Sequence, residues 1–286
     1  MTTTRIPSTR TMLNKVPEVT VYFWLIKVLC TTVGETFADN LNEKLNLGLT
    51  NTTYLMGAAL LVSLAYQFRA RRYVPGVYWL TVVLISVVGT LITDNLTDNL
   101  GVPLVASTIG FAVALVLVFA GWYAREGTLS IHSIDTTSRE AWYWLAILFT
   151  FALGTAAGDL TAERLNVGYG PSAVMFAAVI AVIAITHYAL QARLSASEQR
   201  HRSNAVLAFW LAYILTRPLG ASIGDFMSQP HKHGGLGLGT VVTSAVFLGA
   251  ILALVVYLTV SKVDRIPETG ADPEAEQQLE PAGRGR

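Results

Sequence analysis

At 286 residues, the chain is 52% hydrophobic and only 14% charged, with a mean hydropathy of +0.48. This composition excludes an ordinary water-soluble domain and predicts an integral membrane protein whose main partner is the lipid bilayer. A formal net charge of +1 gives no reason to expect nucleic acid as a partner, and the single cysteine, Cys30, excludes an internal disulfide.

The chain divides into a short basic segment, a long apolar domain and a polar tail. Residues 1–16 precede a full-length apolar run without a cleavage site, so we expect a retained cytoplasmic segment. Residues 17–262 contain eight runs long enough to cross a bilayer, which predicts an all-α integral membrane fold with eight transmembrane helices. Residues 263–286 are rich in Glu, Pro, Gly and Gln, which predicts a disordered cytoplasmic tail. The expected spans are about 18–40, 52–68, 76–95, 103–124, 140–160, 171–191, 205–226 and 237–261.

A repeated skeleton organises the odd-numbered spans. Each carries a tryptophan, a glycine ten residues later and an aspartate five residues after the glycine. This register predicts four helical-hairpin repeats, at about 17–70, 74–125, 139–193 and 204–262. The four copies are Trp24, Gly34 and Asp39; Trp79, Gly89 and Asp94; Trp144, Gly154 and Asp159; and Trp210, Gly220 and Asp225.

Basic residues outside the spans fall mainly on one side, which predicts that both termini are cytoplasmic and that every hairpin turn faces outward. All four repeats then point the same way, as parallel repeats with the four aspartates at one depth. The residues that set this orientation include Arg69, Arg71, Arg72, Arg125, Arg139, Lys262 and Arg265.

Acidic residues cluster around the repeated aspartate. Three repeats place a second acid four residues later, and Glu35 lies four residues before Asp39, so a helix would stack these carboxylates on one face. Clustered carboxylates repel one another unless protons or cations neutralise them, and oxygen ligands suit hard divalent ions. The alternative is that the aspartates are solvated at the membrane interface or cap short helices. The candidate metal ligands or proton carriers are Asp39, Asp94, Asp159 and Asp225, with Glu35, Glu43, Asp98 and Glu163 as an outer attracting shell.

The glycines and tryptophans have simpler explanations. Gly34, Gly89, Gly154 and Gly220 lie at one level of equivalent helices, where small residues let helices pack closely. The four tryptophans lie toward the cytoplasmic boundary, where aromatic side chains anchor membrane helices.

Two basic residues interrupt odd spans and are candidate charge partners of the acids. Lys27 is close enough to the cytoplasmic end to extend its amine toward it, whereas Arg217 is deeper, beside Pro218. We expect Arg217 to pair with a repeated aspartate. His231 and His233 lie in a Gly-rich turn whose metal-binding capacity the sequence leaves open.

Several segments resemble a bacterial multi-spanning family labelled only as a predicted membrane-anchored protein, which implies a location in the bacterial inner membrane. They are residues 15–20, 34–36, 91–95, 154–159 and 216–225. The chain is also more loosely similar to divalent-cation exporters, manganese exporters included, whose repeated helices carry acidic and glycine motifs, although their Glu-x-Gly-Asp order is absent here.

The sequence therefore favours a secondary transporter that moves a divalent metal ion, Mn²⁺ in particular, through a carboxylate-lined site. Two alternatives remain open: a non-transporting membrane scaffold or sensor, and a proton-coupled transporter of a small organic solute. We find no motif that favours an enzyme and expect no bound cofactor. Homo-oligomers are compatible with this class of protein.

Overall fold

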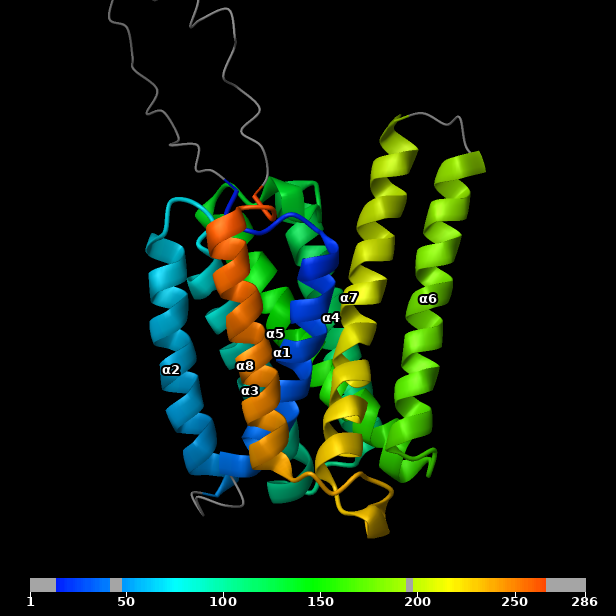
Figure 1. Cartoon of the computed structure of the whole chain (residues 1–286). Coiled ribbons are helices and arrows are strands. Elements are labelled where there is room, and N and C mark those ends of the chain that lie inside the picture. Colours follow the sequence, from blue (N-terminus) through cyan, green and yellow to red (C-terminus); the bar gives the residue numbers. More distant parts are fainter. Residues whose placement is uncertain (1–13, 42–47, 194–197, 266–286) are drawn as a thin grey trace, which may run out of the picture.

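The computed structural model describes residues 14–41, 48–193 and 198–265, and all regular secondary structure in this part of the chain is helical (Figure 1). Three sequence predictions concern residues outside the described ranges. They are the acidic ligand Glu43, the basic segment at residues 1–13 and the disordered tail at residues 266–286. The long helices are α1 (Val21–Asp39), α2 (Leu49–Arg69), α3 (Pro75–Asp94), α4 (Leu104–Glu126), α5 (Thr137–Asp159), α6 (Tyr169–Arg193), α7 (Glu198–Ser228) and α8 (Thr240–Ser261).

Three of the helices begin where local chemistry satisfies or removes a free backbone amide. The Thr20 hydroxyl accepts a hydrogen bond from the Phe23 amide, and the Thr136 hydroxyl accepts one from the Arg139 amide. Pro75 opens α3 at a position where no intrahelical amide is needed.

Three of the four odd helices end at the repeated aspartate. After Asp39, Asp94 and Asp159 the backbone widens into π-helical geometry, at residues 40–41, Asn95–Asn99 and Leu160–Arg164. In the fourth repeat α7 continues as an α-helix beyond Asp225 to Ser228, so this repeat departs from the common pattern.

Seven of the described helices are long and apolar enough to cross a membrane; α2 is the exception to the eight predicted. Its first turn reads Leu49-Thr50-Asn51-Thr52-Thr53, and these polar side chains lower its hydropathy. The outward faces of α4, α6 and α8 are apolar, as expected for helices surrounded by hydrocarbon.

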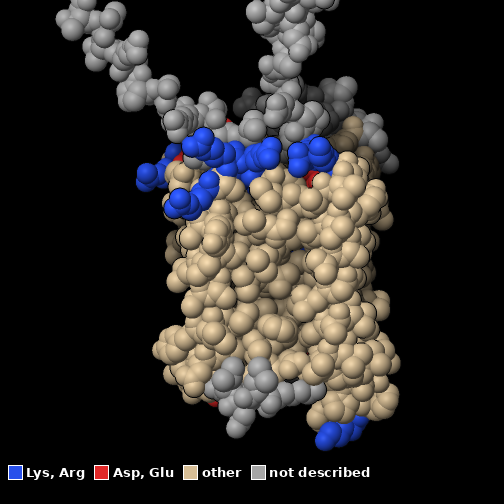
Figure 2. Space-filling model, turned by 60° about the vertical axis from the view of Figure 1, so that its left-hand side comes forward, with Lys and Arg blue, Asp and Glu red and all other residues tan. Residues whose placement is uncertain are grey.

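The two ends of the bundle differ in charge. Both described chain ends lie at the same end, which we call the basic end (Figure 1). Lys and Arg side chains gather there, and an uncharged belt separates them from the opposite end (Figure 2). The opposite, acidic end carries the aspartates at the ends of the odd helices and the turns that follow them.

The odd helices form an inner ring in the order α1, α3, α5, α7, closed by contacts between α7 and α1. The even helices lie outside this ring, and each packs mainly against the odd helix of the following repeat. Thus α2 packs on α3, α4 on α5 and α6 on α7, while α8 closes the circle on α1. The hairpins predicted from the sequence are therefore joined by their turns rather than by tight packing between their own two helices.

The repeated glycines hold the inner ring together. A Cβ on Gly34 would meet Ser86 of α3, and one on Gly89 would meet Phe151 of α5. In the same way Gly154 faces Arg217 of α7, and Gly220 faces Thr31 of α1. Each glycine therefore packs against the residue three positions before the glycine of the next repeat, so one contact is made four times around the ring.

We expect Gly89→Ala and Gly154→Ala each to destabilise the fold by about 1–3 kcal/mol, the range for overpacked cores. Their new Cβ atoms would lie 2.6 Å from the Phe151 Cβ and 2.3 Å from the Arg217 Cγ. Gly57→Ala in α2 and Gly110→Ala in α4 are matched controls, because nothing lies within 4 Å of a Cβ there. Thermal unfolding in detergent measures the difference. If the two ring variants melted at the same temperature as the two controls, the glycine contacts between inner helices would not hold the ring together.

Five layers of side chains fill the interior, because residues four apart on each odd helix face the ring axis. Successive layers are about 6 Å apart along a helix. From the basic end they are Phe23, Tyr78, Tyr143 and Phe209; Lys27, Val82, Ile147 and Tyr213; Thr31, Ser86, Phe151 and Arg217; Glu35, Thr90, Thr155 and Ala221; and Asp39, Asp94, Asp159 and Asp225.

Candidate cation site

Three carboxylates from three inner helices meet at the acidic end of the interior. Each contributes one carboxylate oxygen, and the three oxygens lie within 4.8 Å of one another. The residues are Glu35 of α1, Asp159 of α5 and Asp225 of α7. Glu35 is 6% exposed and Asp225 is 8% exposed, so two of the three are almost removed from solvent. The cluster joins the two layers nearest the acidic end.

The remaining predicted acids lie around this cluster or outside it. Asp94 of α3 is close enough to Glu35, Asp159 and Asp39 to interact with them electrostatically. Asp98 is exposed at the rim, one turn beyond Asp94. Glu163 follows Asp159 within the π-helical turn, but its side chain lies outside the described residues. Glu35, which the sequence assigns to an outer shell, is instead part of the inner cluster.

Arg217 lies directly beneath the carboxylates and has no exposed surface. Its Nη2 atom forms an ion pair with Glu35 Oε2 at 2.7 Å and donates to Thr155 Oγ1 at 2.7 Å and to Thr90 Oγ1. Its Nη1 atom donates to the backbone carbonyl of Thr31 at 3.4 Å. Arg217 therefore links its own helix to the other three inner helices.

The sequence predicts an aspartate partner for Arg217, and the ion pair that the structure shows is with Glu35. The reason is helical register. Arg217 lies three residues before the glycine of its repeat, whereas each of its side-chain partners lies one residue after the glycine of its own repeat. The guanidinium therefore reaches from the third layer to the fourth, which contains Glu35. The aspartates lie a further turn away, toward the acidic end.

The arrangement has more negative than positive charge. Arg217 neutralises one carboxylate of the cluster, while Asp159, Asp225 and Asp94 add three more acids in the same region. Buried like charges of this kind are stable only when protons or cations share them. The site is therefore chemically suited to a cation of higher charge.

The spacing of the three oxygens also suits a hard divalent ion. Ligands bound to Ca²⁺ at about 2.3–2.6 Å can lie up to about 5 Å apart, and those bound to Mg²⁺ at about 2.0–2.1 Å up to about 4 Å apart. Oxygens within 4.8 Å of one another match the larger ion and would need a small inward movement for the smaller one. All three ligand atoms of the cluster found among the described residues are carboxylate oxygens, which favours Mg²⁺, Ca²⁺ or Mn²⁺ over softer metals.

Lys27 lies two layers below Glu35 and is 1% exposed. Its Nζ atom lies 3.8 Å from the centre of the Phe151 ring and 4.3 Å from that of Tyr213. Within the part of the chain that the structure describes, this amine has no hydrogen-bond partner. Lys27 therefore does not extend to the basic end, and none of the described acids forms an ion pair with it.

Aromatic side chains close the interior toward the basic end. Phe23, Trp79 and Tyr213 pack with their rings 5.7–6.3 Å apart, and the hydroxyls of Tyr78 and Tyr143 are 2.5 Å apart. The tryptophans predicted to anchor at the interface belong largely to this filling, since Trp79, Trp144 and Trp210 are buried. Each lies next to an inward-facing position on its helix, so it packs between helices rather than toward lipid.

A buried ion pair that the sequence reasoning missed lies at the basic end. Lys15 Nζ is 2.7 Å from Glu140 Oε2, both residues are 1% exposed, and Gln67 donates to the other carboxylate oxygen. Nearby, Tyr73 Oη donates to Asp264 Oδ2 at 2.5 Å, and burial raises the pKa of both groups. Neither Lys15 nor Glu140 belongs to the repeated skeleton, so no internal comparison marks them.

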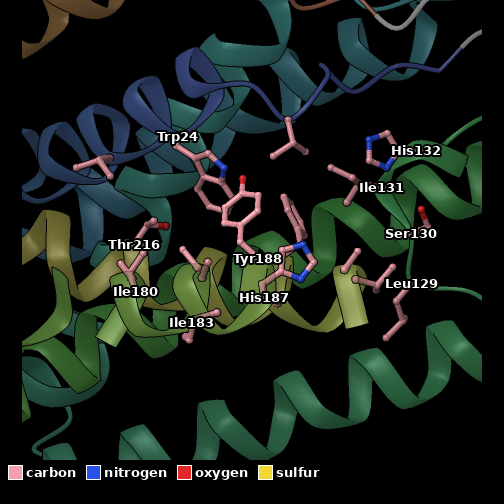
Figure 3. A pocket seen from close by; sticks show the side chains of 18 of the residues that line it. Trp24, Leu129, Ser130, Ile131, His132, Ile180, Ile183, His187, Tyr188 and Thr216 are labelled. Atoms are coloured by element: carbon pink, nitrogen blue, oxygen red, sulfur yellow. The ribbon is translucent and has the colours of Figure 1, made fainter. Parts of the chain in front are cut away.

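An open apolar cleft lies outside the inner ring. It has a volume of about 480 Å³ and lies between α1, α6, α7 and the loop at residues 129–132. Trp24, His132, His187 and Tyr188 line it (Figure 3). None of the clustered carboxylates contributes to this cleft, which has little polar surface for a metal ion.

His231, in the turn after α7, uses Nδ1 to contact the Gly235 carbonyl at 2.9 Å, which holds the turn.

These features define a helical repeat protein with an inner ring of four helices and a buried acidic centre. The chain belongs to the DUF347 family, described as a repeat of unknown function, whose model matches residues 22–73, 77–128, 142–193 and 208–264. Each match contains one odd helix and the even helix after it, so the four repeats expected from the sequence are confirmed. No curated protein and no solved structure matches the chain.

Proposed function

We propose that this protein is a secondary transporter of the bacterial cytoplasmic membrane that moves a divalent cation, with Mn²⁺ favoured, through the acidic centre. One observation carries the proposal: Glu35, Asp159 and Asp225 bring three carboxylate oxygens together from three different helices of the inner ring. A cation bound there would tie these helices together, so binding and helix movement would be coupled.

The position of the acids near one end of the interior supports transport rather than simple storage. The acids lie at the end of the bundle, whereas three layers of larger or cationic side chains separate them from the basic end. In the proposed orientation, with both termini in the cytoplasm, the site lies nearer the outside. Movement of the inner helices would then expose it to the other side.

We expect Asp159→Asn and Asp225→Asn to lose saturable cation flux while keeping the fold. Each change removes a ligand charge but relieves repulsion among the acids, so thermal stability without substrate should stay equal or rise. The measurement is uptake of Mn²⁺, Mg²⁺, Ca²⁺ and Zn²⁺ into proteoliposomes, with and without a pH gradient. Asp98→Asn is the matched control, because this acid is exposed at the rim and its loss should affect only the initial capture of the cation.

Flux that persists in both Asp→Asn variants would refute the proposal. Absence of flux for every ion, with variants and wild type equally stable, would favour the scaffold or the transporter of an organic solute instead.

A further inference from the structure

Lys27 is the one basic residue of its inward-facing layer. The same layer holds Val82 in the second repeat, Ile147 in the third and Tyr213 in the fourth. Apolar side chains therefore fill this position in two of the four repeats. A lysine here is not required for packing, and its presence calls for another explanation.

The surroundings of Lys27 disfavour a permanent positive charge. Its Nζ contacts two aromatic rings, and among residues 14–41, 48–193 and 198–265 it has no hydrogen-bond acceptor. A buried charge without an acceptor is costly, and ring contacts offset only part of that cost. Lysine, unlike arginine, can remove the cost by releasing a proton.

Among the side chains that the structure describes, no acid faces this amine from the neighbouring helices. Cys30 on α1 and Arg217 on α7 act on it electrostatically, and Tyr213 of α7 and Phe151 of α5 present their rings. From α3 the same layer receives Val82, and the nearest α3 acid, Asp94, lies three layers away. α8, which packs against the outside of α1, carries no Asp, Glu, Lys, Arg or His.

Arg217 separates Lys27 from the acids and makes the two sites interdependent. The guanidinium stays charged and is held by Glu35, one layer above. A proton on Lys27 adds a second positive charge to the same column. Such a charge opposes a cation at Glu35, Asp159 and Asp225, so a proton on the amine and a cation at the carboxylates disfavour each other.

We propose that Lys27 is the proton-binding residue that couples cation movement to protons in the opposite direction. The inference rests on the proposed transport function. When the aromatic layers open toward the basic end, water reaches the amine and donates a proton to its lone pair, and the bound cation leaves. When these layers close and the inner helices part at the acidic end, water that enters past Arg217 takes the proton from the amine, and the carboxylates accept a new cation. One proton and one cation then move in opposite directions, and no other reactant is consumed.

The test compares Lys27→Met and Lys27→Arg with the wild type. Both variants keep a side chain of similar length; methionine removes the charge, and arginine makes it permanent. Lys232→Met is the control, because Lys232 is exposed in the turn after α7. Proteoliposomes report Mn²⁺ uptake and internal pH together, and titration calorimetry without a membrane measures Mn²⁺ binding separately.

We expect a pH gradient to change wild-type and Lys232→Met flux by about tenfold or more, with an internal pH change that accompanies Mn²⁺ entry. Lys27→Met should bind Mn²⁺ as the wild type does. Its Mn²⁺ flux should be independent of the pH gradient and should change the internal pH no further. Lys27→Arg should bind Mn²⁺ more weakly and transport slowly at every pH.

If Lys27→Met coupled Mn²⁺ flux to proton movement as the wild type does, the role of Lys27 would be overturned and the proposed function would stand. Wild-type protein that neither binds nor moves any of the cations would overturn both.

Discussion

Arg217→Met is expected to destabilise the protein by about 3–5 kcal/mol, because removing one partner of a buried ion pair leaves the other uncompensated. The carboxylate of Glu35 would lose its 2.7 Å contact with the guanidinium, and Thr90 and Thr155 would lose their donor. Few single changes in this chain disturb all four inner helices at once. Chemical unfolding in detergent, followed by tryptophan fluorescence, measures the loss.

A second substitution separates the ion pair from packing. In Glu35→Gln/Arg217→Met the uncompensated charge is gone, so we expect much of the lost stability to return. Arg217→Lys should be intermediate, because one ammonium cannot reproduce the planar contacts to Glu35, Thr90 and Thr155. If Arg217→Met and the double variant unfolded at the same denaturant concentration, packing of Arg217 against Gly154 would explain the loss instead.

Glu140→Ala is the second change for which we expect a loss of about 3–5 kcal/mol. It would leave the Lys15 ammonium buried with only the Phe68 carbonyl as a hydrogen-bond partner at 3.0 Å. Because Lys15 precedes α1 and Glu140 belongs to α5, the loss should also loosen the chain before α1. Limited proteolysis near residue 15, together with thermal unfolding, measures both effects.

Two comparisons control for the Glu140 result. Glu126→Gln breaks a more exposed pair with Arg139 at the same end and should change stability by less than about 1 kcal/mol. Lys15→Met/Glu140→Met replaces both charges with apolar side chains and should be close to wild type. A double variant as unstable as Glu140→Ala would mean that the volume of these side chains, rather than charge pairing, holds this end closed.

The repeated skeleton was sufficient to predict four repeats and their helical character. Identical spacing from tryptophan to glycine to aspartate places equivalent atoms at equivalent heights whatever the tertiary packing. Spacing along one helix does not reveal which neighbour that helix contacts. The packing of α2 on α3, rather than on α1, therefore could not be read from the hairpin pattern.

The composition of the site was predicted only in part, and the reason is again register. Asp159 and Asp225 were candidates because they recur, but Glu35 has no acidic equivalent at its level in the other repeats. Its inner position follows from the four-residue step that connects Lys27, Thr31 and Glu35 along one face. That stripe was present in the sequence, yet its inward direction became evident only when the residues of all four repeats met across the ring.

The closing contact between α8 and α1 has a consequence for how the chain is made. α1 precedes α8 in the chain, so the outer face of α1 stays uncovered until α8 has been synthesised. A chain that lacked α8 would expose the outer face of α1, including Thr36, whose buried hydroxyl hydrogen-bonds to Ser244 of α8 at 2.7 Å. Premature termination anywhere before α8 should therefore yield a substrate for membrane quality control rather than a smaller working version of the protein.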